Sequence, residues 1–270
     1  MTQLTLKEIW IYPVKSLGGI LLENASVKRK GLQYDRRWML IDQAGVAMTQ
    51  RVYPEMALFK LKLNESNISI AYTRDQRIIS SNQVPLATPS SDKWLFGQVW
   101  NDPVNVLEVD ADLSEWFSHQ LKTDCRLVAF PEEKSRPVDP RYDVNNDQVS
   151  LADAYPFLII GQSSLDDLNN RLVEPVPMNR FRPNFVFMGG EPYAEDKWRN
   201  LSVGTIPFVA VKKSDRCVLT TVNQDTAEKG AEPLRTLSGY RKVENKVYFG
   251  QNLIALKEGQ VSVGEPVIPG

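Results

Sequence analysis

The 270-residue sequence predicts a β-rich α+β fold in two parts. Many short strand-like segments follow one another closely over the first hundred residues, a pattern typical of a small barrel or sandwich. Segments with helical periodicity are few and short. The second half mixes such segments with further strand-like stretches and therefore predicts a β-rich α+β domain. We expect the boundary between the two parts to fall between residues 110 and 150.

Strand-like segments make up most of the first part. The first one ends at Tyr12-Pro-Val-Lys-Ser16, and the pair Gly18-Gly19 then turns the chain into the next. Asp42-Gln-Ala-Gly45 lies between two apolar stretches and predicts a hairpin turn. The predicted strands cover residues 4–14, 20–27, 38–41, 46–49, 57–63, 67–72 and 104–109.

A short helix is predicted over residues 112–121, which places Leu113, Trp116, Phe117 and Leu121 on one face. Residues 131–148 contain three prolines and many charges, and they predict a long loop that is either functional or a simple connector. Another helix is expected to begin at Ser163. The remaining predicted strands cover residues 157–160, 184–188, 206–212, 217–222 and 261–267.

Composition and charge exclude several classes of protein. The formal net charge is -1 and no long basic run occurs, so we expect no broad nucleic-acid binding. The apolar runs are far shorter than a membrane span, and we expect no membrane partner. The N-terminal residues have no basic segment followed by an apolar one, so a cytoplasmic location is expected.

The scarce residues limit the chemistry. Two cysteines, Cys125 and Cys217, are too few for an iron–sulfur cluster, and the absence of C-x-x-C argues against a zinc knuckle or a thioredoxin-like pair. The single histidine, His119, falls off the apolar face of its predicted helix and is interpreted as a surface residue. A Ser-His-Asp triad or a histidine-rich metal site is therefore not expected.

Cys217 is the candidate functional thiol. It follows a polar turn that contains Lys212, Lys213 and Arg216, and cationic neighbours favour the thiolate, the form that attacks or binds metal. The alternative is a small buried apolar side chain. Cationic turns also occur at Lys15-Ser16, at Asp35-Arg36-Arg37 and at residues 179–184. Each could be an ordinary solvated turn, but together they would suit an anionic, phosphate-bearing cofactor beside a soft sulfur ligand.

Seven short motifs occur in order along nearly the whole chain. They are Tyr-Pro-Val-Lys-Ser at 12–16, Asp-Arg-Arg-Trp at 35–38, Ser-Leu-Asp-Asp-Leu-Asn at 164–169, Phe-Arg-Pro-Asn at 181–184, Ser-Asp-Arg-Cys-Val-Leu-Thr-Thr-Val at 214–222, Glu-Pro-Leu-Arg-Thr-Leu at 232–237 and Phe-Gly-Gln-Asn at 249–252. With these motifs the sequence resembles the MOSC superfamily, in particular the mitochondrial amidoxime-reducing component and its bacterial relatives. It departs from them at Ala227, where relatives commonly have glycine.

This resemblance implies an N-terminal β-barrel domain over residues 1–115, followed by a MOSC domain over residues 116–270. The MOSC domain would be a mixed β-barrel with short helices, and a molybdenum–molybdopterin cofactor would lie between the domains. Carried over residue by residue, Cys217 is the catalytic residue and the single protein ligand to molybdenum. The implied cofactor-binding residues are Lys15, Ser16, Arg36 and Arg182 for the pterin and its phosphate, and Asp153, Ala154, Arg216 and Asn252 for further contacts.

The implied function is that of a molybdenum-dependent oxidoreductase that reduces N-hydroxylated substrates by N–O bond reduction. Some bacterial relatives carry a C-terminal ferredoxin domain, whereas this sequence ends at Gly270 without one. Electrons are therefore expected from a separate ferredoxin- or flavin-type reductase. The alternative is a molybdenum-cofactor carrier or sulfur-transfer module without substrate turnover, and a third hypothesis is an interaction protein with no cofactor.

Overall fold

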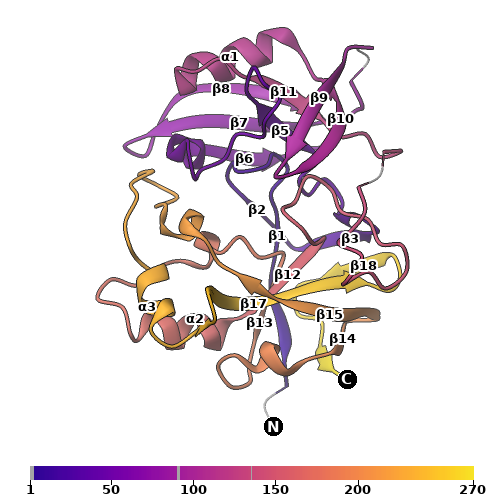
Figure 1. The fold of residues 1–270 in the computed structure, drawn as a ribbon, viewed down its shortest axis with the longest axis vertical. Helices are drawn as coiled ribbons and strands as arrows, with labels where there is room; N and C mark the ends of the chain where they lie inside the picture. The colour runs from indigo at the N-terminus through magenta and orange to yellow at the C-terminus, as the bar shows by residue number, and fades with distance from the viewer. Residues whose placement is uncertain (1–2, 90–91, 135) are drawn as a thin grey trace.

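The computed structural model describes residues 3–89, 92–134 and 136–270, and the chain forms two halves stacked along its longest axis (Figure 1). In that view, most strands of the first 130 residues and helix α1 (Ala111–Leu121) form the upper half. The C-terminal strands form the lower half. The N-terminal strand β1 (Thr5–Ile11) is an exception, because it pairs with strands of the lower half. The first strand thus ties the two halves together.

A nine-stranded sheet makes up most of the lower half. Within it, β12 (Phe157–Gly161) and β13 (Phe185–Met188) pair in parallel, and the other pairs are antiparallel. Helices α2 (Gln162–Asn169) and α3 (Leu234–Ser238) contact this sheet. Its other strands are β2 (Ile20–Leu22), β14 (Asn200–Val203), β15 (Ile206–Asp215), β16 (Lys242–Val243), β17 (Lys246–Ala255) and β19 (Val267–Pro269).

Three smaller sheets complete the fold, and two of them lie in the upper half (Figure 1). One contains β5 (Trp38–Ile41), β11 (Arg126–Ala129), β10 (Asp102–Glu108) and β9 (Trp94–Val99) in spatial order. Another contains β6 (Phe59–Leu63), β7 (Asn67–Arg74) and β8 (Arg77–Pro85). The third contains β18 (Gly259–Ser262), β3 (Asn24–Lys28) and β4 (Gly31–Leu32). Short 3-10 turns occur at Pro54–Leu58, Met178–Arg180, Ala194–Lys197 and Val218–Thr221.

One hydrophobic core runs through both halves. In the upper half, the ring of Phe59 packs against those of Trp116 and Phe117 on α1, with centroid distances of 5.7 and 5.2 Å. In the lower half, Phe157 and Phe208 belong to the same continuous cluster of buried side chains. The two halves therefore share one close-packed interior.

Most of the predicted elements are confirmed. The strands at 38–41, 157–160 and 184–188 are present within one residue, and the helix predicted at 112–121 is α1. This helix begins where the Asp110 carboxylate accepts a hydrogen bond from the backbone N–H of Leu113, at 2.9 Å. The fold class is confirmed as strand-rich. No helix of the described residues combines the length and the apolar character that a membrane crossing needs.

Two predicted strands of the first part are wrong in detail. Residues 46–49 make only isolated bridges, from Val46 to Gln98 and from Ala47 to Ile41, so the predicted hairpin has no second strand. The segment 20–27 divides into β2 and β3 at Glu23. Several strands were missed because their outward faces are polar or exposed, which hides the apolar run expected of a strand; β8 is the clearest case.

Two predicted strands of the second part are also wrong. Residues 217–222 form a 3-10 turn, because the hydroxyls of Thr220 and Thr221 donate to the carbonyls of Cys217 and Val218, at 2.9 and 2.8 Å. The segment 261–267 is divided between β18 and β19. β17 was missed as well, and it contains Gly250 with a φ of +84°, where a Cβ would lie 2.9 Å from the carbonyl oxygen of Ile159.

Candidate functional site

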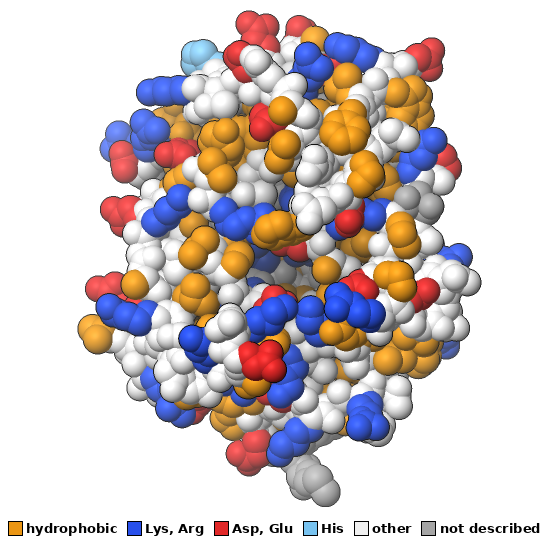
Figure 2. All heavy atoms as spheres, viewed as in Figure 1, with side chains coloured by type: hydrophobic (Ala, Val, Ile, Leu, Met, Phe, Trp, Pro, Cys, Tyr) orange, Lys and Arg blue, Asp and Glu red, His pale blue; other side chains and the backbone are white. Residues whose placement is uncertain are grey.

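A cavity of about 200 Å³ lies between the two halves, and it opens at the hollow visible in Figure 2. Residues from distant parts of the chain line it, including the β1–β2 connection, the loop before β12 and the segment after β15. All nine residues predicted for the site are among them: Lys15, Ser16, Arg36, Asp153, Ala154, Arg182, Arg216, Cys217 and Asn252. The fold thus brings the predicted residues together, and their roles remain predictions.

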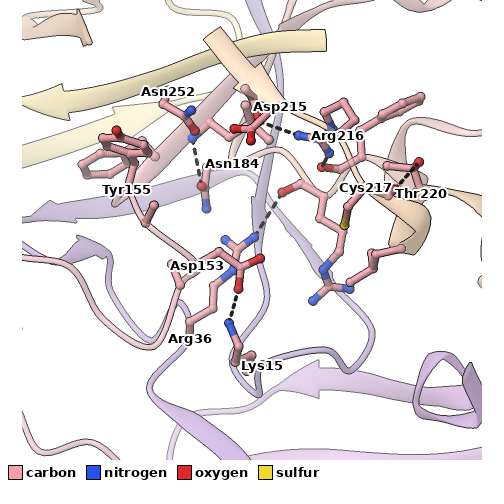
Figure 3. A pocket seen from close by; sticks show the side chains of 18 of the residues that line it. Lys15, Arg36, Asp153, Tyr155, Asn184, Asp215, Arg216, Cys217, Thr220 and Asn252 are labelled. Atoms are coloured by element: carbon pink, nitrogen blue, oxygen red, sulfur yellow. Dashed lines mark hydrogen bonds and ion pairs between the residues drawn. The ribbon is translucent and has the colours of Figure 1, made fainter. Parts of the chain in front are cut away.

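Cys217 lies directly after β15, where the strand gives way to the 3-10 turn. The register of β15 against β17 shifts between Lys213 and Asp215, so the end of β15 is irregular. Cys217 then has extended backbone angles and caps the turn, and its side chain is exposed (Figure 3). The sequence-based alternative of a buried apolar cysteine is therefore wrong for Cys217 and applies to Cys125, which is buried.

Lys15 forms a buried cation on the wall opposite the turn. Its ammonium donates to the carbonyl of Leu151 at 2.9 Å and forms an ion pair with Asp153 (Figure 3). Burial lowers the pKa of Lys15, and the charge of Asp153 offsets this only in part. An anion bound nearby would stabilise the protonated ammonium.

Arg36 and Arg182 lie over the ring of Tyr12, with guanidinium carbons 4.4 and 4.2 Å from the ring centroid. Both residues have left-handed backbone angles, with φ of 50° and 56°. Arg182 donates to the carbonyl of Leu17 at 2.7 Å, and Arg36 donates to the carbonyl of Arg182 at 3.1 Å. Burial lowers the pKa of Arg182 to about 10, so it stays charged at neutral pH.

Arg216 approaches the cavity from the Cys217 side. It donates to the hydroxyl of Ser214 at 2.7 Å and to the carbonyl of Phe181. Its Nε is buried and has no hydrogen-bond partner among the described residues. Burial lowers the pKa of Arg216 to about 10. A buried, charged donor without an acceptor is costly, which indicates that a ligand supplies the acceptor.

The charges of the cavity are unbalanced. Six cations line it among the described residues, namely Lys15, Arg36, Arg51, Arg182, Lys212 and Arg216. Two lining carboxylates, Asp153 and Asp215, and the buried Asp35, which pairs with Arg36 at 2.6 Å, stand against them. The donors of these cations and the exposed thiol of Cys217 suit an anionic group that also presents a soft metal. The residues present therefore fit a phosphate-bearing molybdenum–pterin cofactor.

Several lining residues were missed by the sequence analysis. Asn184 belongs to a quoted motif, but its side chain connects strands, because it accepts from the Leu158 N–H and donates to the Trp10 carbonyl, both at 3.2 Å. Arg51 follows the mispredicted strand at 46–49, and no pattern around it pointed to a site. The other missed residues include Tyr155, Asp215 and Thr220, and Lys212 had been named only as a cationic neighbour of Cys217.

Arg136 holds the cavity wall from behind. Its guanidinium donates to the carbonyls of Ser150, Ala152 and Asp153, and it forms an ion pair with Asp102 at 2.7 Å. The arginine is buried and Asp102 lies at the start of β10, so this contact fixes the segment before β12 against the upper half. The loop predicted at 131–148 thus has a structural role, because its residue Arg136 holds the segment before β12 in place.

Replacing Arg136 with leucine is expected to destabilise the protein by about 2–3 kcal/mol, because buried carbonyls lose their donors. Urea unfolding would measure the difference. Arg141→Leu is the matched control, since Arg141 is exposed and pairs only with the nearby Asp139. Equal stability of the two variants would show that the Arg136 contacts contribute nothing beyond those of a surface ion pair.

Comparisons with known proteins agree with this arrangement. The model of the MOSC N-terminal beta barrel domain matches residues 3–124, and the model of the MOSC domain matches residues 146–268. Mitochondrial amidoxime-reducing component 1 of Mus musculus is 35% identical, over 97% of this chain and 81% of its own length. The Homo sapiens protein of the same name is 34% identical, over 97% and 82%. A molybdenum cofactor sulfurase of Arabidopsis thaliana is 29% identical, over 98% of this chain but 35% of its own length.

Proposed function

Because the chain belongs to the MOSC family, with a MOSC N-terminal β-barrel domain followed by a MOSC domain, we propose that it binds a molybdenum–pterin cofactor and reduces N-hydroxylated compounds. The observation that carries this proposal is an exposed thiol, Cys217, facing a buried excess of cations in one cavity. The names of the amidoxime-reducing relatives support the reaction class. A cytoplasmic location remains a prediction.

Each predicted residue has a distinct task in this proposal. Cys217 would be the protein ligand to the metal, and Arg216 would supply its free Nε–H to the pterin side of the cofactor. Lys15, Arg36 and Arg182 would bind the phosphate. When bound, the cofactor would supply the two-electron redox chemistry, while the protein supplies binding and orientation.

The overall reaction would convert R-NH-OH, two electrons and two protons to R-NH2 and water. The cavity walls hold the reacting groups away from bulk water on the inner side, and the hollow between the halves leaves one face open (Figure 2). A substrate would therefore approach Cys217 from the open face. The deep cations on the inner side would remain occupied by the cofactor.

Replacing Arg182 with alanine is expected to lower cofactor retention by about tenfold or more, because a charge-assisted hydrogen bond is worth roughly 1.5–3 kcal/mol. Molybdenum and pterin would be measured in the purified protein after gel filtration. Arg171→Ala is the matched control, since Arg171 is exposed and pairs with Asp167 outside the cavity. Unchanged molybdenum and pterin contents in Arg182→Ala would show that Arg182 has only a structural role.

The proposed function is tested on protein purified from a host that makes the cofactor. We expect one molybdenum and one pterin per chain, and dye-driven reduction of an N-hydroxylated compound. A protein that carries neither metal nor pterin would refute the cofactor assignment.

A second candidate function is a carrier or sulfur-transfer module, which the molybdenum cofactor sulfurase relatives favour. In that case Cys217 would handle sulfur or pass on the cofactor, and no substrate would be turned over. A fully loaded protein that fails to oxidise reduced dye in the presence of substrate would support this candidate over the reductase.

A further inference from the structure

Arg51 is a cation at the cavity that the predicted cofactor contacts do not include. It comes from the upper half and reaches across the cleft to the residues of the lower half. Its Nη1 lies 3.9 Å from the sulfur of Cys217 and 3.6 Å from a carboxylate oxygen of Asp153. Arg51 is thus the arginine whose guanidinium lies nearest to the proposed metal ligand among the described contacts.

The donors of Arg51 are available to a ligand. The cations assigned to the cofactor, Lys15, Arg36, Arg182 and Arg216, each donate to a protein oxygen, as Arg182 does to Leu17 and Lys15 does to Leu151. Within the described part of the chain, the guanidinium of Arg51 has no such oxygen acceptor, and its closest carboxylate is 3.6 Å away. Five N–H donors in a planar fork can therefore turn to a group bound beside Cys217.

The position of Arg51 is fixed from both halves of the molecule. Its guanidinium stacks on the ring of Trp100 at 4.2 Å, and its backbone carbonyl accepts a hydrogen bond from the ammonium of Lys229 at 2.8 Å. Its side chain is 19% exposed, so it lies at the mouth of the cavity and still borders the solvent. Preorganised donors of this kind are effective where negative charge develops during a reaction.

We propose that Arg51 is a catalytic residue that donates hydrogen bonds to the oxygen atom of the substrate N–O group. This inference rests on the proposed function. In the reaction, the N–O bond breaks, the electrons come from the external donor, and the two protons come from water and end on nitrogen and oxygen. Negative charge builds on the departing oxygen, and the guanidinium of Arg51 stabilises it while keeping its own protons.

The test compares two ligands that differ at the N–O oxygen, benzamidoxime and benzamidine. Binding is measured by calorimetry on molybdenum-loaded protein without an electron source, so that no turnover occurs. In Arg51→Gln we expect the affinity for benzamidoxime to fall roughly 10- to 100-fold, as for loss of a hydrogen bond to a charged group. The affinity for the cationic benzamidine should be unchanged or higher, because a positive charge has been removed.

Turnover and a matched control complete the test. The kcat of Arg51→Gln with dye should fall at least as far as its affinity, and Arg51→Lys should keep an intermediate rate, since lysine preserves the charge but not the fork. Lys60→Gln removes a cation outside this cavity and should leave both ligands and kcat unaffected. Molybdenum and pterin contents should stay unchanged in all three variants.

Specific outcomes would overturn the inference. Loss of molybdenum in Arg51→Gln would make Arg51 a cofactor residue, and an equal loss of affinity for both ligands would reduce its role to general electrostatics. Normal binding and kcat in Arg51→Gln would remove any role. If the loaded wild-type protein neither binds nor reduces benzamidoxime, the proposed function itself fails, which separates that result from failure of the Arg51 assignment.

Discussion

Replacing Cys217 with alanine is expected to abolish reduction of N-hydroxylated compounds while leaving the fold intact. The thiol is exposed in the cavity, so its removal should cost about 1 kcal/mol or less. The loss of activity should instead be complete, because Cys217 is the soft ligand proposed for the metal. Dye-driven activity, molybdenum content and thermal unfolding would be measured on the same preparation.

Cys125→Ala is the matched control for this experiment, because it also leaves one cysteine. Cys125 is buried beside Ser118, whose hydroxyl lies 3.5 Å from its sulfur. It lies in the upper half and is not among the residues that line the cavity. Burial raises the pKa of the Cys125 thiol, which keeps it protonated and unreactive. It should therefore retain full activity. A folded Cys217→Ala protein with wild-type activity would refute the assignment of Cys217.

The sequence predicted which residues meet at the cavity better than it predicted the strands around it. Cys217, Arg182 and Lys15 each belong to a quoted motif, and a motif marks a residue whatever local structure surrounds it. The predicted local structure at Cys217 was nevertheless wrong. The β-branched run that follows Cys217 suggested a strand, but these residues form a 3-10 turn. The hydroxyls of Thr220 and Thr221 donate to backbone carbonyls three residues earlier and so favour the turn. The composition of the segment does not reveal whether its threonines will form such bonds or a strand.

The missed features depend on contacts between distant segments. Arg51 has no motif around it and becomes part of the cavity only when the upper half closes on the turn at Cys217. The pairing of β1 with β13 joins residues that are about 180 positions apart, and no period in the sequence records such a partner. Ala227 shows a related case, because it has a φ of 63°, in the left-handed region that glycine adopts without strain.

The second large effect concerns the supply of electrons. The 270 residues contain two cysteines and no G-x-G-x-x-G loop, so they offer neither four thiolates for an iron–sulfur cluster nor this signature of nicotinamide or flavin binding. Each turnover needs two electrons, and we expect them to come from a separate ferredoxin- or flavin-type protein. Such encounters use small interfaces that separate quickly.

The purified protein with NADH or NADPH alone is therefore expected to show no reduction of an N-hydroxylated compound above background. Reduced viologen should restore turnover, because a small dye reaches the cavity without a docking partner. An acidic ferredoxin with its reductase should also restore it. Lysine and arginine side chains lie along both edges of the hollow in Figure 2, so this activity should fall severalfold between about 50 and 200 mM salt, as charge screening predicts.

Dye-driven turnover is the internal control. Reduced viologen is a small cation that docks on no charged edge, so its rate should not fall over the same range of salt. Turnover with NADPH and no partner would show that the chain contains a further redox site. Salt dependence of equal size with dye and with ferredoxin would place the effect on the substrate or the cofactor rather than on docking. The charged edges of the cleft would then have no part in electron delivery.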